Sequence, residues 1–186
     1  MKHEVRQNWQ LWSGALDDNA CDAIIEESRK YPEERGFIFS DRDSENPHRK
    51  SNVRWLSECQ EVGTLLWDYT EKANQVLDVN VEPLAEIQYT EYVGSEGGHY
   101  GYHHDVDWSR NDNYDRKLSI TVQLSCPSEY TGGEFQFTEV ENPPMDALKK
   151  RGSVLVFPSY LVHAVSPVTR GLRRSVVAWF EGPTWK

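Results

Sequence analysis

The chain has 186 residues, with 30 acidic and 20 basic side chains and a formal net charge of −10. This length suits one domain that can bury a sizeable core without metal or disulfide support, so we expect residues 1–186 to form a single domain. The acidic surface repels phosphate backbones, which argues against a nucleic-acid partner.

Cysteine usage and hydropathy predict a cytoplasmic protein. The three cysteines, Cys21, Cys59 and Cys126, are odd in number and widely spaced, a pattern typical of reduced thiols in a cytosol-like compartment. The N-terminal residues contain no apolar signal-peptide core, and no apolar run is long enough to cross a bilayer. We therefore expect no membrane partner. The sequence leaves the oligomeric state open.

The N-terminal part of the chain, about residues 10–80, has the pattern of a helical support. Leu16, Ala20, Ile24, Ile25 and Ser28 fall on one helical face, and Asp17 and Asp18 supply the N-cap signal. A second helix is predicted over about Glu61 to Leu77, where apolar residues again recur at helical spacing. Between them, the charged and apolar-poor segment Ser40 to Lys50 predicts a mobile loop that could close over a substrate.

From about residue 82 to 183 the pattern changes to short apolar runs bounded by turn residues. The runs are LAEIQYTEYV, HYGYHHDVDW, LSITVQLSC, EFQFTEV, SVLVFP, LVHAV and RSVVAWF. Six or seven strands after two helices predict an α+β, mainly β fold: a double-stranded β-helix, or jelly roll, with N-terminal helices packed on one sheet. Such a double sheet leaves an open mouth where ligands bind.

The run HYGYHHDVDW contains a candidate metal-binding pair. On a strand, His103 and Asp105 point to the same side. His104 points to the other side together with Val106, which cannot bind a metal. Asp107 is the rival carboxylate, but only Asp105 has a His two residues before it. Strand periodicity therefore selects His103 and Asp105 as the pair.

A third ligand must come from another part of the chain. Of the six histidines, His163 is the downstream candidate on a predicted strand, LVHAV. Two His and one carboxylate on one triangular face leave the other metal positions open, which suits non-haem Fe(II) that activates oxygen. Taken alone, the same residues would also fit a surface turn and a core histidine whose hydrogen bonds are satisfied.

Arg173 follows His163 by ten residues. The intervening Thr169-Arg170-Gly171 predicts a turn, and we expect the two flanking runs to form a hairpin. On such a hairpin the two side chains would be offset by roughly 15 Å of strand, at about 3.3 Å per residue. That gap can hold a small dicarboxylate, with one end on the metal and the other on the guanidinium, which binds carboxylate in a fork geometry.

These residues resemble, in order, the pattern of the 2-oxoglutarate/Fe(II) oxygenase superfamily, and specifically its prolyl 4-hydroxylase-like branch. That pattern is a Tyr, a Gly, Y-x-x-H-x-D, a Gly-Gly-Glu, and a His with a basic residue ten positions on. The matching residues are Tyr92, Gly94, Tyr100, His103, Asp105, Gly132-Gly133-Glu134, His163 and Arg173, with Trp179 six residues after the Arg. The segment RKSNVRWL resembles the family's Arg-x-Ser segment, so the likeness covers roughly residues 10 to 183.

The resemblance implies Fe(II) as the metal, 2-oxoglutarate and O2 as cosubstrates, and ascorbate as a supporting reductant. It implies no catalytic residue beyond the metal centre. Carried over one by one, its site residues are the iron ligands His103, Asp105 and His163; the 2-oxoglutarate-binding residues Arg173 and Tyr92; and the substrate-side residues Tyr100, Arg116 and Trp179.

The function implied by this resemblance is that of a dioxygenase, a prolyl 4-hydroxylase, which hydroxylates a prolyl residue in a peptide or protein and releases succinate and CO2. Three departures from the collagen-type enzymes bear on the substrate: Arg173 stands where Lys is usual, the loop from Tyr92 to His103 is longer, and Glu181 stands where a His can occur. Two alternatives stay open. One is the same chemistry on a free amino acid or other small molecule, and the other is a non-catalytic jelly-roll binding module.

Overall fold

The computed structural model describes residues 7–36 and 47–186. Its helices are α1 (Asp18–Ser28), α2 (Gln60–Leu77) and α3 (Met145–Lys149), and single 3-10 turns lie at η1 (Gly94–Glu96) and η2 (Pro127–Glu129). The strands are β1 (Gln10–Trp12), β2 (Glu34–Arg35), β3 (Arg49–Lys50), β4 (Asn52–Trp55), β5 (Ala85–Val93), β6 (His99–His103), β7 (Tyr114–Gln123), β8 (Tyr130–Gly132), β9 (Phe135–Phe137), β10 (Val154–Pro158), β11 (His163–Val165) and β12 (Val168–Pro183).

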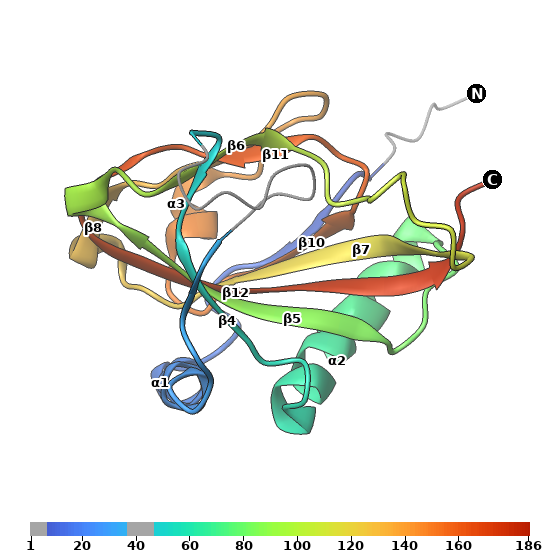
Figure 1. Ribbon diagram of the computed structural model, residues 1–186, viewed down its shortest axis with the longest axis horizontal. Coiled ribbons are helices and arrows are strands. Elements are labelled where there is room, and N and C mark those ends of the chain that lie inside the picture. The colour runs from blue at the N-terminus through green and yellow to red at the C-terminus, as the bar shows by residue number, and fades with distance from the viewer. Residues whose placement is uncertain (1–6, 37–46) are drawn as a thin grey trace.

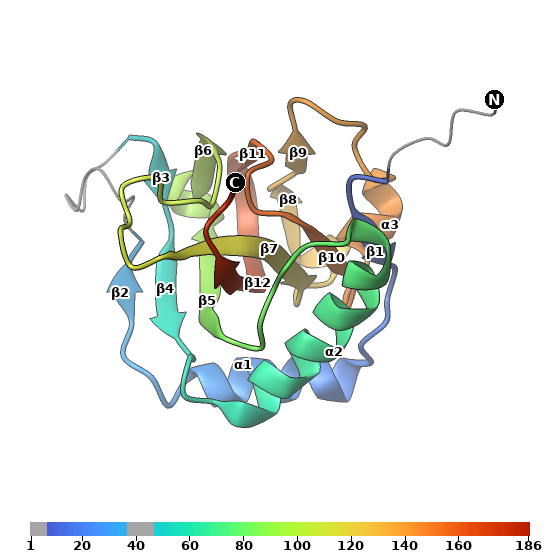
Figure 2. The same cartoon turned by 90° about the vertical axis from the view of Figure 1, so that its right-hand side faces the viewer.

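Two antiparallel sheets form the jelly roll. The larger has the order β1-β10-β7-β12-β5-β4-β2, with β8 added alongside β12, and the smaller has the order β3-β6-β11-β9. The two sheets lie one above the other, and α1 and α2 cover the outer face of the larger sheet (Figures 1 and 2). The predicted jelly roll, with its N-terminal helices on one sheet, is confirmed.

The two long helices begin and end as their sequences predict. Asp17 caps α1 by accepting a 2.8 Å hydrogen bond from the backbone N–H of Ala20, which satisfies one of the free donors of the first turn. α2 ends at Asp78, which adopts the left-handed conformation (φ 52°) and donates its N–H to Asn74.

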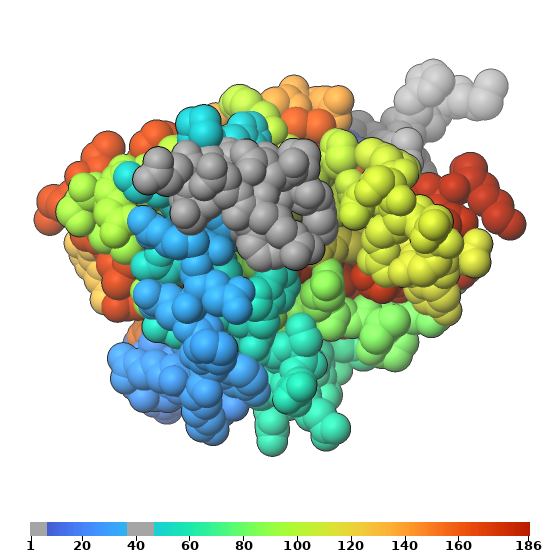
Figure 3. All heavy atoms as spheres, viewed as in Figure 1, coloured from blue at the N-terminus to red at the C-terminus, as the bar shows by residue number. Residues whose placement is uncertain are grey.

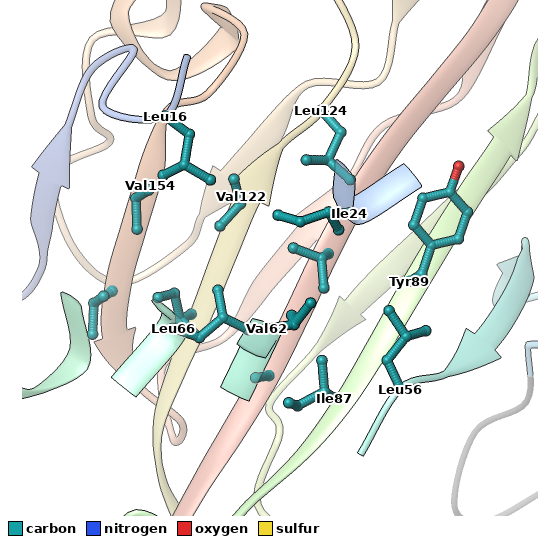
Figure 4. Close-up of a cluster of buried hydrophobic side chains, with 14 of the residues drawn as sticks. Leu16, Ile24, Leu56, Val62, Leu66, Ile87, Tyr89, Val122, Leu124 and Val154 are labelled. Carbon is teal, nitrogen blue, oxygen red and sulfur yellow. The ribbon is translucent and has the colours of Figure 1, made fainter. Parts of the chain in front are cut away.

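The main core lies between these helices and the larger sheet (Figure 4). Alternation along β7 sends Leu118, Ile120 and Val122 to the helix side, where all three are buried. From α2, Leu66 meets them with no exposed surface, a burial that stabilises the fold by about 2 kcal/mol. The alternate β7 residues, Ser119 and Thr121, line a cavity on the other side.

The N-terminal region is less purely helical than the sequence predicts. Its strands β1, β2 and β4 extend the larger sheet, and β3 pairs with β6 of the smaller one. Each has two to four residues, too few for alternation to show. The predicted loop Ser40 to Lys50 lies partly outside the described residues, and its last two residues form β3.

The predicted hairpin between His163 and Arg173 is wrong. β11 pairs with β6 and β9 in the smaller sheet, whereas β12 pairs with β5, β7 and β8. The Thr169-Arg170-Gly171 segment is part of β12 and lies against β8 instead of turning. Pro167, which has no N–H for a ladder, lies between the strands where the chain crosses from one sheet to the other. His163 and Arg173 therefore lie on different sheets and line the same cavity.

The loop between β6 and β7 lies on the molecular surface, where its atoms (yellow) occupy one side of the face shown in Figure 3. Trp108 in this loop is 60% exposed. Among the described residues, none of the helices combines the length and the apolar character that a membrane span requires.

Candidate metal centre and its cavity

Three side chains converge where β6 meets β11. His103 ends β6 and His163 begins β11, and the two residues are directly paired across the strands. Asp105 follows two residues after His103. Its carboxylate lies 3.5 Å from His103 Nε2 and 3.6 Å from His163 Nε2, and the three ligand atoms all lie within 4.8 Å of one another. This spacing suits one metal ion held on one triangular face.

Backbone hydrogen bonds fix both imidazoles. His103 Nδ1 lies 2.8 Å from the carbonyl oxygen of Gly101, and His163 Nδ1 lies 2.9 Å from that of Leu161. Because a carbonyl oxygen only accepts, each Nδ1 carries the proton and donates it. The Nε2 lone pairs are thereby left for a metal, which is the usual arrangement of metal-binding histidines.

Two buried serines hold Asp105: Ser119 bonds its carboxylate, and Ser159 bonds its backbone. Ser119, on the cavity side of β7, donates its hydroxyl to Asp105 Oδ2 at 2.6 Å and lies 2.9 Å from the hydroxyl of Ser159. Ser159, which follows β10, accepts the backbone N–H of Asp105 at 2.8 Å. Sequence reasoning missed both serines. Only the inward parity of Ser119 within LSITVQLSC hinted at a polar contact there.

The charges of the cluster suit metal binding. Burial alone would raise the pKa of Asp105, but His163, His103 and Ser119 together hold it well below its usual range. Burial is the largest of the effects that lower the pKa of His163 to about 4; Asp105 opposes it and His103 adds to it. At neutral pH the carboxylate is thus ionised and the His163 imidazole neutral, the states in which both groups bind metals.

The triad and Arg173 line the same cavity between the sheets. It holds about 490 Å³ of space between protein atoms, part of it open to solvent. Apolar side chains of Phe135, Phe157, Val165 and Val177 form part of its walls. Beside apolar walls, polar interactions are stronger than they are in bulk water.

Arg173 presents a buried donor that lacks a partner. The residue is 6% exposed, and its Nε makes no hydrogen bond within the described part of the chain. The guanidinium lies 5.5 Å from the ring centre of Tyr92, its cross-strand partner on β5. Burial raises the pKa of Tyr92, so its hydroxyl keeps its proton. A buried guanidinium with an unused N–H fits a carboxylate group.

A cleft of mixed aromatic and cationic character adjoins this cavity beside the triad. Tyr100 stacks on His103, with ring centres 3.4 Å apart, and the Arg49 guanidinium lies 4.5 Å from the Tyr100 ring centre. In the same cleft, the Arg116 guanidinium lies 4.0 Å from the ring centre of Trp179. Arg49, together with Trp55 and Gln88, was not singled out from the sequence as a site residue, although Arg49 and Trp55 lie within RKSNVRWL.

A β-bulge explains how Arg116 comes to face the cleft. Leu118 pairs with Phe180, but the next pair is Arg116 with Glu181, so Lys117 has no partner on β12. In an uninterrupted strand Arg116 would share the helix side with Leu118. The extra residue reverses the alternation, as bulges beside functional sites often do.

The structure brings together the site residues that the sequence predicts. Seven of them line the cavity: Tyr92, Tyr100, His103, Asp105, His163, Arg173 and Trp179. The eighth, Arg116, lines the adjoining cleft. The rival Asp107 lies apart from the triad, and its Oδ1 accepts two hydrogen bonds from Ser109. His104 is exposed and hydrogen-bonds Trp108.

Two His and one carboxylate that leave the other metal positions open form the facial triad, which is typical of non-haem Fe(II) oxygenases. Residues 87–181, just over half of the chain, match the sequence model of the 2OG-Fe(II) oxygenase superfamily. The chain therefore belongs to this superfamily, for which Fe(II) is the metal and 2-oxoglutarate the cosubstrate. The triad and the buried Arg173 fit both.

Relatives by sequence are PKHD-type hydroxylases. One from Parvibaculum lavamentivorans is 39% identical over 120 residues, which cover 63% of this chain and 52% of the relative. Another, from Idiomarina loihiensis, is 31% identical over 132 residues, or 71% of this chain and 59% of the relative. The chain thus spans about half the length of these curated relatives.

Solved structures with the same fold include three prolyl hydroxylases. The viral collagen prolyl hydroxylase of Paramecium Bursaria Chlorella virus-1, in complex with 2OG, has a TM-score of 0.67 at 21% identity, covering 95% of this chain and 97% of the other. A Pseudomonas putida prolyl-4-hydroxylase also gives 0.67 at 21% identity, with coverages of 93% and 92%. The Trichoplax adhaerens prolyl hydroxylase, in complex with a hypoxia inducible factor peptide fragment, gives 0.72 at 14% identity, with coverages of 93% and 83%.

Proposed function

We propose that the protein is an Fe(II)- and 2-oxoglutarate-dependent dioxygenase that hydroxylates a prolyl residue in a peptide or protein and releases succinate and CO2. One observation carries the proposal: a single cavity is lined both by a His-Asp-His cluster and by Arg173, whose buried Nε lacks a hydrogen-bond partner among the described residues. The cluster suits a metal, and the guanidinium suits the far carboxylate of a dicarboxylic acid.

Each residue has a defined part in this proposal. His103, Asp105 and His163 hold the metal, and Fe(II) bound there supplies, with 2-oxoglutarate and O2, the oxidising chemistry that inserts oxygen into a C–H bond. Arg173 pairs with the distal carboxylate, and the protonated hydroxyl of Tyr92 donates a hydrogen bond to it. Both side chains come from adjacent strands of the larger sheet, so the carboxylate is held by a rigid support.

The chain's own contribution is orientation and exclusion of water. Ser119 fixes the carboxylate of Asp105, the carbonyl oxygen of Ser159 fixes its backbone N–H, and backbone carbonyls fix the two imidazoles. Phe135 and Phe157 pack against His163, with ring centres 5.2 and 4.8 Å away, and close the inner side of the site. A rigid, preformed face of this kind leaves the open metal positions pointing into the cavity.

Prolyl hydroxylation is supported by the cleft beside the triad and by the names of similar proteins. Tyr100 and Trp179 give the cleft an aromatic lining against which a pyrrolidine ring can pack, and Arg116 beside Trp179 can donate to a peptide carbonyl. The relatives are hydroxylases, and one protein of the same fold was solved with a peptide fragment. We assign these three residues to the substrate side.

Mass spectrometry tests the proposal directly. Proline-containing peptides are incubated with the protein, Fe(II), ascorbate and 2-oxoglutarate, and we expect a gain of one oxygen atom on proline with matching release of succinate. The variant His103→Ala should produce neither. Succinate release without any oxidised peptide would move the substrate assignment to a small molecule, and full activity in His103→Ala would refute the metal assignment.

A further inference from the structure

A second pocket lies on the other side of β7 from the cleft. It is lined by Lys117, Pro158, Tyr160 and Trp185, together with residues that follow α2, and we call it the C-terminal pocket. It holds about 690 Å³ of empty space, part of it open to solvent. The β7 bulge divides the two sites, because it directs Arg116 to the cleft and Lys117 to this pocket.

Lys117 is a buried charge without a hydrogen bond. It is 3% exposed, yet within the part of the chain that the structure describes its ammonium makes neither a hydrogen bond nor an ion pair. Its contact is with Trp185, whose ring centre lies 3.7 Å from Nζ. Burial lowers the pKa of Lys117, while Asp115 acts weakly in the other direction. Nζ itself borders the pocket, because Arg173 Nε is the one fully buried side-chain nitrogen or oxygen without a partner among the described residues. Its three N–H donors are therefore open to a ligand in the pocket.

The walls of the pocket indicate what could accept those donors. Tyr160 and Trp185 meet edge to face, with ring centres 5.2 Å apart, and present apolar surface next to the ammonium. Two carboxylates lie close by: Asp78, which lines the pocket, and Asp115, whose Oδ2 already accepts the backbone N–H of Trp185 at 2.7 Å. Both repel anions, and they repel a doubly charged phosphate more strongly than a singly charged carboxylate, so a carboxylate is the anion that suits Lys117.

We propose that the C-terminal pocket binds a small monocarboxylate, whose carboxylate group pairs with Lys117 Nζ and whose apolar part packs on Tyr160 and Trp185. The site is distinct from the cavity that holds Arg173. It is nevertheless linked to the triad, because Ser159 donates its N–H to the carbonyl of Lys117 at 3.0 Å and accepts the N–H of Asp105 at 2.8 Å.

Calorimetry with 4-methylpentanoate as the probe tests this site. The protein is loaded with Fe(II) and saturating 2-oxoglutarate under argon, so that the metal cavity is occupied. We expect one additional binding event per chain, and no binding of inorganic phosphate or of the uncharged 4-methylpentanamide. In Lys117→Met the affinity should fall at least about tenfold, the lower end expected for loss of a charged hydrogen bond. Lys72→Met, an exposed lysine of α2, is the matched control and should bind as the wild type does.

A second measurement uses the unaltered protein and does not depend on the folding of a variant. Cyanate carbamylates uncharged amines, and mass spectrometry reports its extent at Lys117. We expect 4-methylpentanoate to protect Lys117 and to leave Lys72 unprotected. The proposal is overturned if the probe fails to bind the wild type, if Lys117→Met or the amide binds equally well, or if Lys117 gains no protection.

Discussion

Replacing Ser119 by alanine isolates the support of the metal carboxylate. Ser119 is 2% exposed and donates a 2.6 Å hydrogen bond to Asp105 Oδ2. A buried hydrogen bond to an ionised acceptor contributes about 1.5–3 kcal/mol. We therefore expect Ser119→Ala to lower the affinity for Fe(II) by roughly 10- to 100-fold, since about 1.4 kcal/mol corresponds to a factor of ten.

The same substitution changes the pH dependence of stability in the metal-free protein. The folded-state pKa of Asp105 is lowered, so this group stabilises the fold above its unfolded pKa, and that contribution is lost as pH falls. Loss of the Ser119 donor makes the folded-state pKa less depressed. The free energy of unfolding should then fall at neutral pH and change less on acidification.

Anaerobic Fe(II) titration and urea unfolding measure these two effects. Ser125→Ala is the matched control. Ser125 is also a buried serine, and its hydroxyl makes hydrogen bonds to the backbone of Leu172 and Arg174 rather than to Asp105. This control should lose stability and keep its iron affinity. Equal iron affinity in Ser119→Ala and the wild type would refute the reasoning, as would an equal loss in both variants.

Three further variants test the triad and Arg173. Asp105→Asn should abolish Fe(II) binding measured by titration, whereas Asp107→Asn, from the carboxylate outside the triad, should retain it; the reverse result would exchange the ligand assignment. Arg173→Ala should raise the apparent Michaelis constant for 2-oxoglutarate by about 10- to 100-fold, and Arg170→Ala, an exposed arginine of the same strand, should leave it unchanged. Gly133→Ala should cost about 1 kcal/mol of stability, because Gly133 has a positive φ of 62°. It should also weaken 2-oxoglutarate binding, because the added Cβ would lie 2.7 Å from Arg173 Cδ. Wild-type binding in this variant would contradict the placement of Arg173.

Local periodicity accounts for what the sequence could predict of the fold. α2 was expected over about Glu61 to Leu77 and spans Gln60–Leu77, because its apolar residues repeat over several turns. Strands β5, β7, β10 and β12 are long enough for alternation or apolar runs to show. β1 to β4 could not be found in this way, since short strands are fixed by the partners that hydrogen-bond them.

Site residues that lie close together in the sequence could be predicted, whereas those brought together only by folding could not. Strand parity paired His103 with Asp105 within one segment, although β6 ends at His103 and Asp105 lies just beyond the strand. Ser159 comes from a different part of the chain, and only the folded sheets bring it to Ser119. The relation of His163 to Arg173 was predicted with the right outcome and the wrong geometry: the residues share one cavity, but they lie on different sheets and not on one hairpin.

Because of the bulge at Lys117, the effect of a one-residue insertion or deletion in β7 depends on its position. Deleting Lys117 would place Arg116 directly before Leu118, and normal alternation would keep Arg116 on the cleft side. One residue could thus be lost with the metal site and its cleft retained, while the C-terminal pocket would lose the ammonium of Lys117. An insertion between Leu118 and Ser119 would instead turn Ser119 away from Asp105. Within this single strand, a one-residue change preserves the metal site at Lys117 and disrupts it immediately after Leu118.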